Sequence, residues 1–219
     1  MTHDIRSSLL FLNSAAPDVQ IFGVGYSLGA GLLTNYLGEM GEKSGFSAGY
    51  AVSNVWDYYT CYTEFTSGSL ISKLVYNTTL GQRHRVAIYK NRDAFVPPSP
   101  SDEATTKLNH RVSVKHSPEA LNRIHNALQT ILVDPFLTMS TFSREFLAMT
   151  SGYETFDEFH TKTSSTQHIK NIKTPLLCIT SRDDPLMREP LLPLKEISES
   201  SHVVMALTRK GTQLYASFN

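Results

Sequence analysis

The segment Gly25–Gly29, with the sequence GYSLG, constrains the fold of this 219-residue chain more strongly than any other. The apolar run from Val19 to Val24 leads into it, and the stretch from Leu28 to Met40 has the spacing of an amphipathic helix. In the pattern G-x-S-x-G, glycines two residues from the serine leave room for the backbone of a tight turn. The sequence therefore predicts a strand, a turn at Ser27 and a helix.

A serine in such a turn has the position of a nucleophile. Its hydroxyl would project above the edge of a sheet, where the N-terminus of the helix and the Leu28 backbone N–H would stabilise the negative charge of a tetrahedral intermediate. A glycine-rich turn whose serine has no catalytic role would fit the same sequence pattern. The apolar strand before it and the helix after it favour a nucleophilic Ser27.

The order of the predicted elements indicates an α/β fold with a mainly parallel sheet and flanking helices. A helix is expected over residues 2–14. Residues 56–168 are aromatic, polar and mostly helical in pattern, so we expect a helical cap inserted into one domain that spans residues 1–219. Four segments have the composition of strands: Val19–Val24, Gly45–Ser53, Leu176–Thr180 and Val203–Thr208.

A turn with two carboxylates follows the third strand candidate. Asp184 is the predicted acid, because a carboxylate there would hold a histidine in the correct tautomer and stabilise its charged form. Its neighbour Asp183 is the alternative, although it could instead cap the turn. Asp93 also resembles an acid turn, but residues 80–90 before it look helical, so we expect a solvated residue near a helix end.

The composition excludes several other classes of protein. Lys plus Arg and Asp plus Glu number 20 each, so the chain has no global charge that would attract nucleic acid. Cys61 and Cys178 indicate neither a disulfide framework nor a metal site, and we expect no metal and no cofactor. The sequence has neither a signal peptide nor the roughly 18 apolar residues of a transmembrane helix, which leaves a cytoplasmic or a membrane-associated location open.

Eight segments form an ordered set that is more specific than the serine motif alone: Thr2–Arg6, Gly25–Gly31, Asn35–Glu39, Val52–Asp57, Gly152–Tyr153, Ser164–Ser165, Ile172–Leu177 and Asp183–Leu186. This set resembles the α/β-hydrolase subfamily of membrane-associated acylglycerol and phospholipid lipases, yeast medium-chain ethyl ester synthases and bacterial soluble esterases. The resemblance implies an α/β-hydrolase fold and a serine carboxylic-ester hydrolase. It implies an acyl-enzyme on Ser27, Asp184 as the acid and the Leu28 N–H as one oxyanion donor.

The sequence departs from this subfamily at the histidine. The subfamily has Gly-Gly-His after the last strand, whereas Gly211 is followed here by Thr212 and Gln213. Gln213 therefore occupies the position of the missing base, and glutamine cannot accept the serine proton at neutral pH. Among the eight histidines His202 comes nearest, but an exposed residue at the start of the last strand is its simpler interpretation.

The second departure is in length. The subfamily has several strands, and a His-Gly loop that donates a second oxyanion N–H, before the region where this sequence starts. It also has a closing helix after the region where this sequence stops. We therefore expect the hydrolase domain to be incomplete at both ends, with the strand around Ile21–Val24 left with an unpaired edge.

Two functions from different classes follow from these observations. The first is an ester hydrolase whose substrate is an acylglycerol or a similar small ester or lipid. The second is a catalytically dead remnant that at most binds lipid or a partner chain, which Gln213 and the missing strands favour.

Aromatic residues of the insertion and its flanks allow two interpretations. Trp56 and Asp57 could line an acyl pocket, but packing is the simpler role for Trp56. Membrane contact could come from an upstream anchor or from aromatic side chains of the cap. Packing in the core of the cap is the simpler role for these aromatic side chains. These aromatics are Tyr58, Tyr59, Tyr62, Phe65, Phe136, Phe142 and Phe146.

Overall fold

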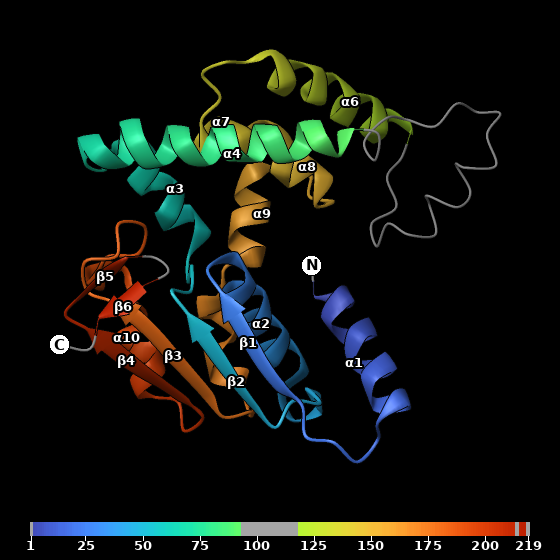
Figure 1. The fold of residues 1–219 in the computed structure, drawn as a ribbon, viewed down its shortest axis with the longest axis vertical. Helices are drawn as coiled ribbons and strands as arrows, with labels where there is room; N and C mark the ends of the chain where they lie inside the picture. The colour runs from blue at the N-terminus through green and yellow to red at the C-terminus, as the bar shows by residue number, and fades with distance from the viewer. Residues whose placement is uncertain (1, 93–117, 213–214, 218–219) are drawn as a thin grey trace. The chain divides into compact units, whose positions relative to one another are not determined.

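The computed structural model describes residues 2–92, 118–212 and 215–217, which form two compact units (Figure 1). The sheet unit spans the segments Met1–Cys61 and His160–Asn219. The helical unit spans Tyr62–Phe159 and falls within the segment 56–168 that the sequence indicated as an insertion.

The sheet has four parallel strands in the order β1-β2-β3-β4, and the fold is of the α/β class that the sequence predicted. The first strand begins three residues later than predicted, because Val19 lies in the turn after Pro17. The strands are β1 (Phe22–Tyr26), β2 (Ala48–Val52), β3 (Leu176–Ser181) and β4 (Val203–Thr208).

Three helical segments of this unit lie on one face of the sheet. Helix α2 contacts β1, β2 and η5, and α10 contacts η5 and β4, so these three elements share a face (Figure 1). Leu33 and Leu37 of α2 are buried in this layer, and α1 joins α2 through a hydrogen bond from the Thr2 hydroxyl to Glu39 (2.5 Å). The elements are α1 (His3–Ala15), α2 (Leu28–Met40), η1 (Gly41–Lys43), η5 (Ser165–Asn171), η6 (Glu189–Leu191) and α10 (Leu194–Ser198).

A short antiparallel hairpin follows the last parallel strand. It consists of β5 (Lys210–Thr212) and β6 (Tyr215–Ser217), and both strands contact β3. The sequence did not predict this hairpin, because strands of three residues are too short to show an alternating pattern.

The helical unit has its own apolar core. Six buried side chains form the centre: Ile124, Leu128, Ile131, Leu137, Phe142 and Phe146. The core role predicted for Phe142 and Phe146 is therefore confirmed, whereas Phe136 is 79% exposed. The elements are α3 (Tyr58–Ser67), which begins in the sheet unit, η2 (Ser72–Tyr76), α4 (Asn77–Lys90), α6 (Pro118–Val133), α7 (Met139–Phe142), η4 (Ser143–Leu147), α8 (Ala148–Thr150) and α9 (Phe156–Thr163).

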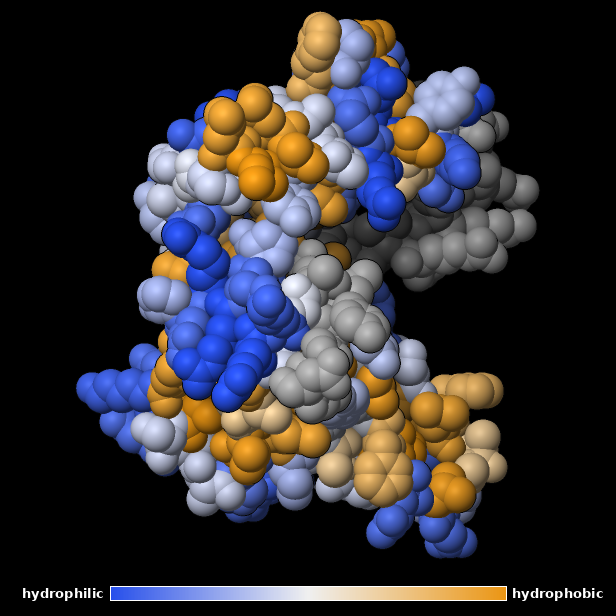
Figure 2. All heavy atoms as spheres, turned by 60° about the vertical axis from the view of Figure 1, so that its left-hand side comes forward, coloured by the Kyte–Doolittle hydropathy of each residue, from blue (hydrophilic) through white to orange (hydrophobic). Residues whose placement is uncertain are grey.

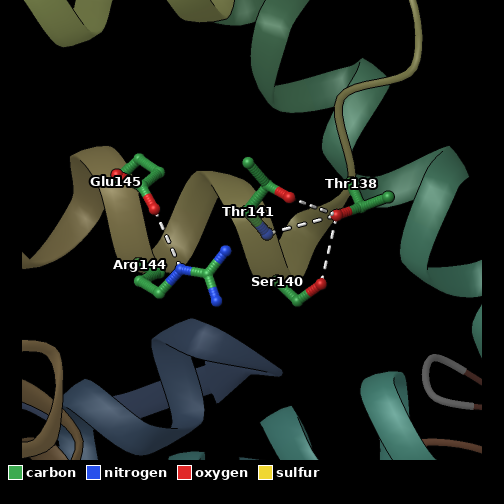
Figure 3. Close-up of polar contacts among 5 residues, drawn as sticks. All are labelled: Thr138, Ser140, Thr141, Arg144 and Glu145. Atoms are coloured by element: carbon green, nitrogen blue, oxygen red, sulfur yellow. Dashed lines mark hydrogen bonds and ion pairs between the residues drawn. The ribbon is translucent and has the colours of Figure 1, made fainter.

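Polar contacts fix the start of α7 against α4. The Thr138 hydroxyl accepts a hydrogen bond from the Thr141 N–H (3.1 Å) and caps the helix (Figure 3). The buried Asn77 of α4 accepts from the Ser140 N–H (2.9 Å) and donates to the Ser140 hydroxyl (3.1 Å). One turn further along, Arg144 pairs with Glu145 (2.9 Å) at the surface.

No helix in the described residues is long and apolar enough to span a membrane.

Polar side chains also join the two points where the chain leaves and re-enters the sheet unit. After β2, the Asn54 amide donates to the Ser165 hydroxyl (3.2 Å). Three residues later, Asp57 accepts from the Ser164 hydroxyl (3.1 Å). We call Asn54, Asp57, Ser164 and Ser165 the clasp, in which all but Asp57 are buried. The clasp gives a physical role to the two serines that the sequence singled out only by resemblance.

Trp56 and Asp57 have structural roles in this region. Trp56 is completely buried, which confirms the packing interpretation. The Asp57 carboxylate accepts from the Tyr59 N–H (2.9 Å) and from the Thr60 hydroxyl (2.7 Å), so it caps the first turn of α3.

Replacing Ser165 by alanine should lower the free energy of unfolding of the sheet unit by about 1–3 kcal/mol, because the buried Asn54 amide loses one of its partners. Urea unfolding followed by circular dichroism measures this loss. Ser8→Ala, at an exposed position of α1, is the matched control and should stay within about 0.5 kcal/mol of the wild type. Equal losses in both variants would contradict the role of the clasp.

Candidate active site

Ser27 lies in the turn between β1 and α2, where its backbone adopts φ 50° and ψ −117°. A positive φ is unfavourable for a residue with a Cβ, and such strained positions concentrate at functional sites. The turn is held from both sides. The Ser27 N–H donates to the Val52 carbonyl (2.9 Å), and the Ser27 carbonyl accepts from the N–H groups of Ala30 (3.0 Å) and Gly31 (3.2 Å).

The two glycines of the motif differ in their surroundings. A Cβ on Gly25 would lie 2.5 Å from the Gly29 carbonyl oxygen and 2.7 Å from the Ala30 nitrogen, so only glycine fits there. A Cβ on Gly29 would meet no described atom within 4 Å. The expectation that both glycines make room for the backbone is therefore correct for Gly25 and wrong for Gly29.

The helix that starts at Leu28 points its N-terminus at the turn. Its first N–H groups carry the partial positive charge of the helix dipole, which favours a developing anion. Residues 30, 31 and 33–38 of this helix are buried, so its position is fixed by packing. The role of the Leu28 N–H as an oxyanion donor stays a prediction.

Asp184 is buried, with only 1% of its surface exposed, three residues after the end of β3. Its Oδ1 accepts hydrogen bonds from the backbone N–H groups of Leu186 (2.8 Å) and Met187 (3.2 Å). Burial raises the pKa of this carboxyl, the two N–H donors oppose the rise, and the neighbouring Asp183 adds to it. Both of these hydrogen bonds use Oδ1.

The raised pKa of Asp184 predicts how the stability of the protein depends on pH. The Asp184 carboxyl binds its proton more tightly in the folded state than in the unfolded state. Its contribution to stability is therefore greatest below the unfolded pKa of about 3.9, and it is lost as the pH rises through the folded pKa. Asp184→Asn keeps an acceptor for Leu186 and Met187 and should raise the Tm at pH 7. Thermal unfolding at pH 7 and at about pH 3 is the measurement. A gain that persists at the lower pH would contradict this cause.

Asp183 has a different task from its neighbour. Its Oδ1 accepts from the Gly211 N–H (3.0 Å) in β5, so it holds the start of the hairpin that leads to position 213. The sequence kept Asp183 as the alternative acid or as a turn cap, and it did not suggest this bond because the hairpin itself was not predicted. Gln213 and Asp93 lie outside the described residues.

Ser27 and Asp184 both follow carboxyl ends of strands in one parallel sheet, so they lie at the same edge. Tyr26 at the end of β1 pairs with Val52, and Val52 pairs with Ile179 of β3. Two strand spacings separate β1 from β3, or about 10 Å. The roles of Ser27 as the nucleophile and of Asp184 as the acid stay predictions.

His202 lies at the opposite edge of the sheet. Its carbonyl accepts from the N–H of Leu176, the first residue of β3 (2.8 Å), so about 17 Å of strand separates it from the carboxyl ends. It lines a cleft of about 450 Å³ with Lys170, Lys173 and Glu196. His202 is therefore excluded as a replacement base, which corrects the alternative that the sequence left open.

Comparison with known proteins gives relatives over nearly the whole chain, although no family model matches it. The chain is 24% identical to phospholipase ABHD3 of Homo sapiens over 210 residues, which cover 96% of this chain and 44% of the relative. It is 25% identical to the monoacylglycerol lipase of Saccharomyces cerevisiae over 226 residues (98% and 44%). It is 27% identical to medium-chain fatty acid ethyl ester synthase/esterase 2 of the same yeast over 213 residues (97% and 45%). The chain thus spans less than half the length of these relatives.

Solved structures with similar folds have low identity and TM-scores below 0.5. An alpha/beta fold family hydrolase from Bacillus anthracis has a TM-score of 0.48 at 12% identity, covering 97% of this chain and 67% of that chain. The monoacylglycerol lipase of Paleococcus ferrophilus has a TM-score of 0.45 at 11% identity, covering 97% and 65%. The sequence relatives match this chain over the parallel sheet, the Ser27 turn and the buried Asp184, and they support a likeness to the α/β-hydrolase family of lipases and esterases.

Proposed function

We propose that this chain carries the nucleophile and the acid of a serine carboxylic-ester hydrolase that acts on acylglycerols or related lipid esters. The observation that carries the proposal is the backbone of Ser27, which is held at φ 50° between a strand and the N-terminus of a buried helix. A residue with a Cβ keeps such a conformation only where its surroundings enforce it. The names of the relatives, a phospholipase, a monoacylglycerol lipase and an ester synthase/esterase, support the substrate class.

In the proposed reaction the Ser27 Oγ attacks the ester carbonyl carbon, and a base accepts the hydroxyl proton. The tetrahedral oxyanion receives a hydrogen bond from the Leu28 N–H and the field of the α2 dipole. Collapse breaks the bond between the carbonyl carbon and the alkoxy oxygen, and the proton leaves with the alcohol. Water then hydrolyses the acyl-enzyme on Ser27. Asp184 would orient the base and stabilise its charged form.

A catalytically dead remnant is the second candidate, and one specific observation favours it. Position 213, where the base is expected, holds glutamine, and the side chain of glutamine is not basic at neutral pH. Such a chain would at most bind lipid or a partner through the same fold.

A fluorophosphonate probe separates the two candidates, because it reacts once with an activated serine and so detects rates too slow for turnover assays. We expect slow labelling of Ser27 in the wild-type chain and faster labelling in Gln213→His, read by mass spectrometry of the peptide that contains Ser27. Ser27→Ala and a heat-denatured sample are the controls. Absence of labelling in both the wild type and Gln213→His would refute the hydrolase and leave the remnant.

We also propose that the helical unit contacts lipid surfaces. Apolar side chains are exposed along η2, α4 and the two helical residues before them, and we call this set the stripe: Leu70, Ile71, Leu74, Val75, Val86 and Tyr89. Figure 2 shows hydrophobic side chains gathered on this unit. A shallow hollow of about 660 Å³ lies over Leu74, Val75 and Val86. Residues 65–92 contain five Lys or Arg residues and no Asp or Glu, as expected for a helix that lies on an anionic membrane surface.

Sedimentation with vesicles tests the lipid contact. Binding to phosphatidylcholine vesicles that contain phosphatidylserine should exceed binding to pure phosphatidylcholine, and the double variant Leu74→Asp/Val75→Asp should weaken it by about tenfold or more. Phe136→Asp, at an exposed apolar position of the same unit outside the stripe, is the control. Equal binding by both variants would refute this surface.

A further inference from the structure

Ser53 shares an unusual backbone conformation with Ser27. In the described part of the chain these two serines are the residues other than glycine that have a positive φ, and both have φ 50°. This conformation is unfavourable for a residue with a Cβ, whereas glycine adopts it without strain. Strained positions of this kind concentrate at active sites and ligand contacts. The backbone of Ser53 therefore indicates a second functional position.

The two strained serines lie next to each other at the carboxyl edge of the sheet. Ser27 follows β1, and its N–H donates to the Val52 carbonyl of β2 (2.9 Å). Ser53 follows β2, and its N–H donates to the Ile179 carbonyl of β3 (2.8 Å). Neighbouring strands are about 4.8 Å apart, so the Ser53 turn lies between the Ser27 turn and the end of β3 (Figure 1).

Buried hydroxyl groups at the end of β3 add a second observation. Thr180 and Ser181 are 2% and 1% exposed, and their hydroxyl oxygens have no hydrogen-bond partner in the described residues. Ser53 lies beside this pair, because Val52 and Ile179 are partners in the strand register. Successive side chains of a strand point to opposite faces, so one of the two hydroxyls shares a face with Ser53. A buried hydroxyl is ordinarily paired, and an unpaired one indicates a bound water or ligand.

The place of Ser53 at the end of β2 corresponds to the alcohol side of the ester in the proposed reaction. The base of that reaction lies between Ser27 and Asp184, which follow β1 and β3, and therefore over the end of β2. The alkoxy oxygen receives its proton from the same base, so the alcohol part of the ester lies over the end of β2 as well. A hydroxyl at position 53 would meet this part of the substrate.

We infer that the Ser53 hydroxyl binds a hydroxyl group on the alcohol part of the ester. A hydroxyl donates one hydrogen bond and accepts others, so it complements an alcohol that carries a further hydroxyl group. The site therefore favours esters of polyols, such as glycerol, over esters of simple alkyl alcohols. The inference rests on the proposed function, because it requires Ser27 to be the nucleophile.

Two fluorophosphonate probes with the same alkyl chain test the inference. One carries an ethoxy group on phosphorus and the other a dihydroxypropoxy group. With both probes a bond forms between the Ser27 Oγ and phosphorus, fluoride leaves, and the hydroxyl proton passes to solvent. The alkoxy group of the adduct stands in for the alcohol part of the ester. We expect the dihydroxypropoxy probe to label Ser27 of the wild-type chain about fivefold faster or more, because it gains one hydrogen bond.

Variants at position 53 separate the hydroxyl from the backbone. Ser53→Ala and Ser53→Gly both remove the hydroxyl and should abolish the preference between the probes, read by mass spectrometry of the peptide that contains Ser27. Only Ser53→Gly relieves the strained φ, so its Tm should lie above that of Ser53→Ala. Ser47→Gly, at an exposed position before the amino end of the same strand, is the matched control and should keep the preference.

Three results would overturn the inference while Ser27 is labelled. Equal labelling of the wild type by both probes would show that water alone satisfies the hydroxyl groups at this edge. A preference that Ser53→Ala retains would exclude the hydroxyl as its cause. Loss of the preference in Ser53→Gly alone would assign it to the backbone. Absence of labelling by both probes, in the wild type and in Gln213→His, would instead refute the proposed function and the inference with it.

Discussion

Replacing Gly25 by alanine should destabilise the sheet unit by about 3 kcal/mol or more. The added Cβ would lie 2.5 Å from the Gly29 carbonyl oxygen and 2.7 Å from the Ala30 nitrogen. Both are backbone atoms of the turn and of α2, so they cannot rotate away as a flexible side chain would. The expected outcome is separation of α2 from β1 at the Ser27 turn, measured as a lower urea midpoint and faster amide exchange in β1.

Gly29→Ala is the matched control, because the same methyl group would enter open space. Alanine is also a better helix former than glycine, so this variant should be as stable as the wild type or slightly more stable. The two substitutions lie within the same motif and differ only in what the Cβ meets. Comparable losses in both would show that the packing of α2 on β1 is looser than the structure describes.

Exchanging Gln213 for histidine should leave this chain nearly inactive towards p-nitrophenyl butyrate, with kcat/KM changed by less than about tenfold. Catalytic groups that act as one unit lose most of their value when one is absent, and a histidine alone does not supply a second oxyanion donor beside the Leu28 N–H. The same variant joined to the part of the yeast monoacylglycerol lipase outside the matched segment, which we call the joined form, should gain about 10³-fold or more, because a histidine then acts together with Ser27 and Asp184.

Four proteins test this prediction: the wild type and Gln213→His, each alone and in the joined form. Ser27→Ala in the joined Gln213→His form is the control and should return the rate to background. Wild-type turnover that Ser27→Ala abolishes would refute the argument and point to another histidine as the base. His202 cannot take that role, because it lies at the amino ends of the strands.

The sequence predicted those features that depend on local pattern. The four parallel strands and α2 were found because apolar runs and helical spacing are visible within ten residues. Ser27 was found for the same reason, since the turn chemistry lies within five residues. Asp184 was preferred to Asp183 by its position in the turn, and the structure shows one carboxylate buried and the other bound to Gly211.

Features that depend on contacts distant in sequence could not be predicted. Asn54 and Ser165 are 111 residues apart, and no short pattern signals their hydrogen bond. The open space next to Gly29 could not be predicted either, because it depends on how α2 lies on β1 and not on the motif. His202 is a different case, because the sequence already placed it at the start of the last strand, and a strand of this parallel sheet starts at the far edge.

The clasp has a consequence for how the length of related chains can vary. Because Asn54 and Asp57 are bonded to Ser165 and Ser164, the ends of the segment Tyr62–Phe159 are anchored within the sheet unit itself. Closing a longer segment between fixed ends costs entropy only with the logarithm of its length, about 0.6 kcal/mol for each doubling. Insertions and deletions between the two anchors therefore change the free energy of folding of the sheet unit only slightly. Natural variation in chain length should accumulate there, while the spacing from Ser27 to Asp57 and from Ser164 to Asp184 stays constant.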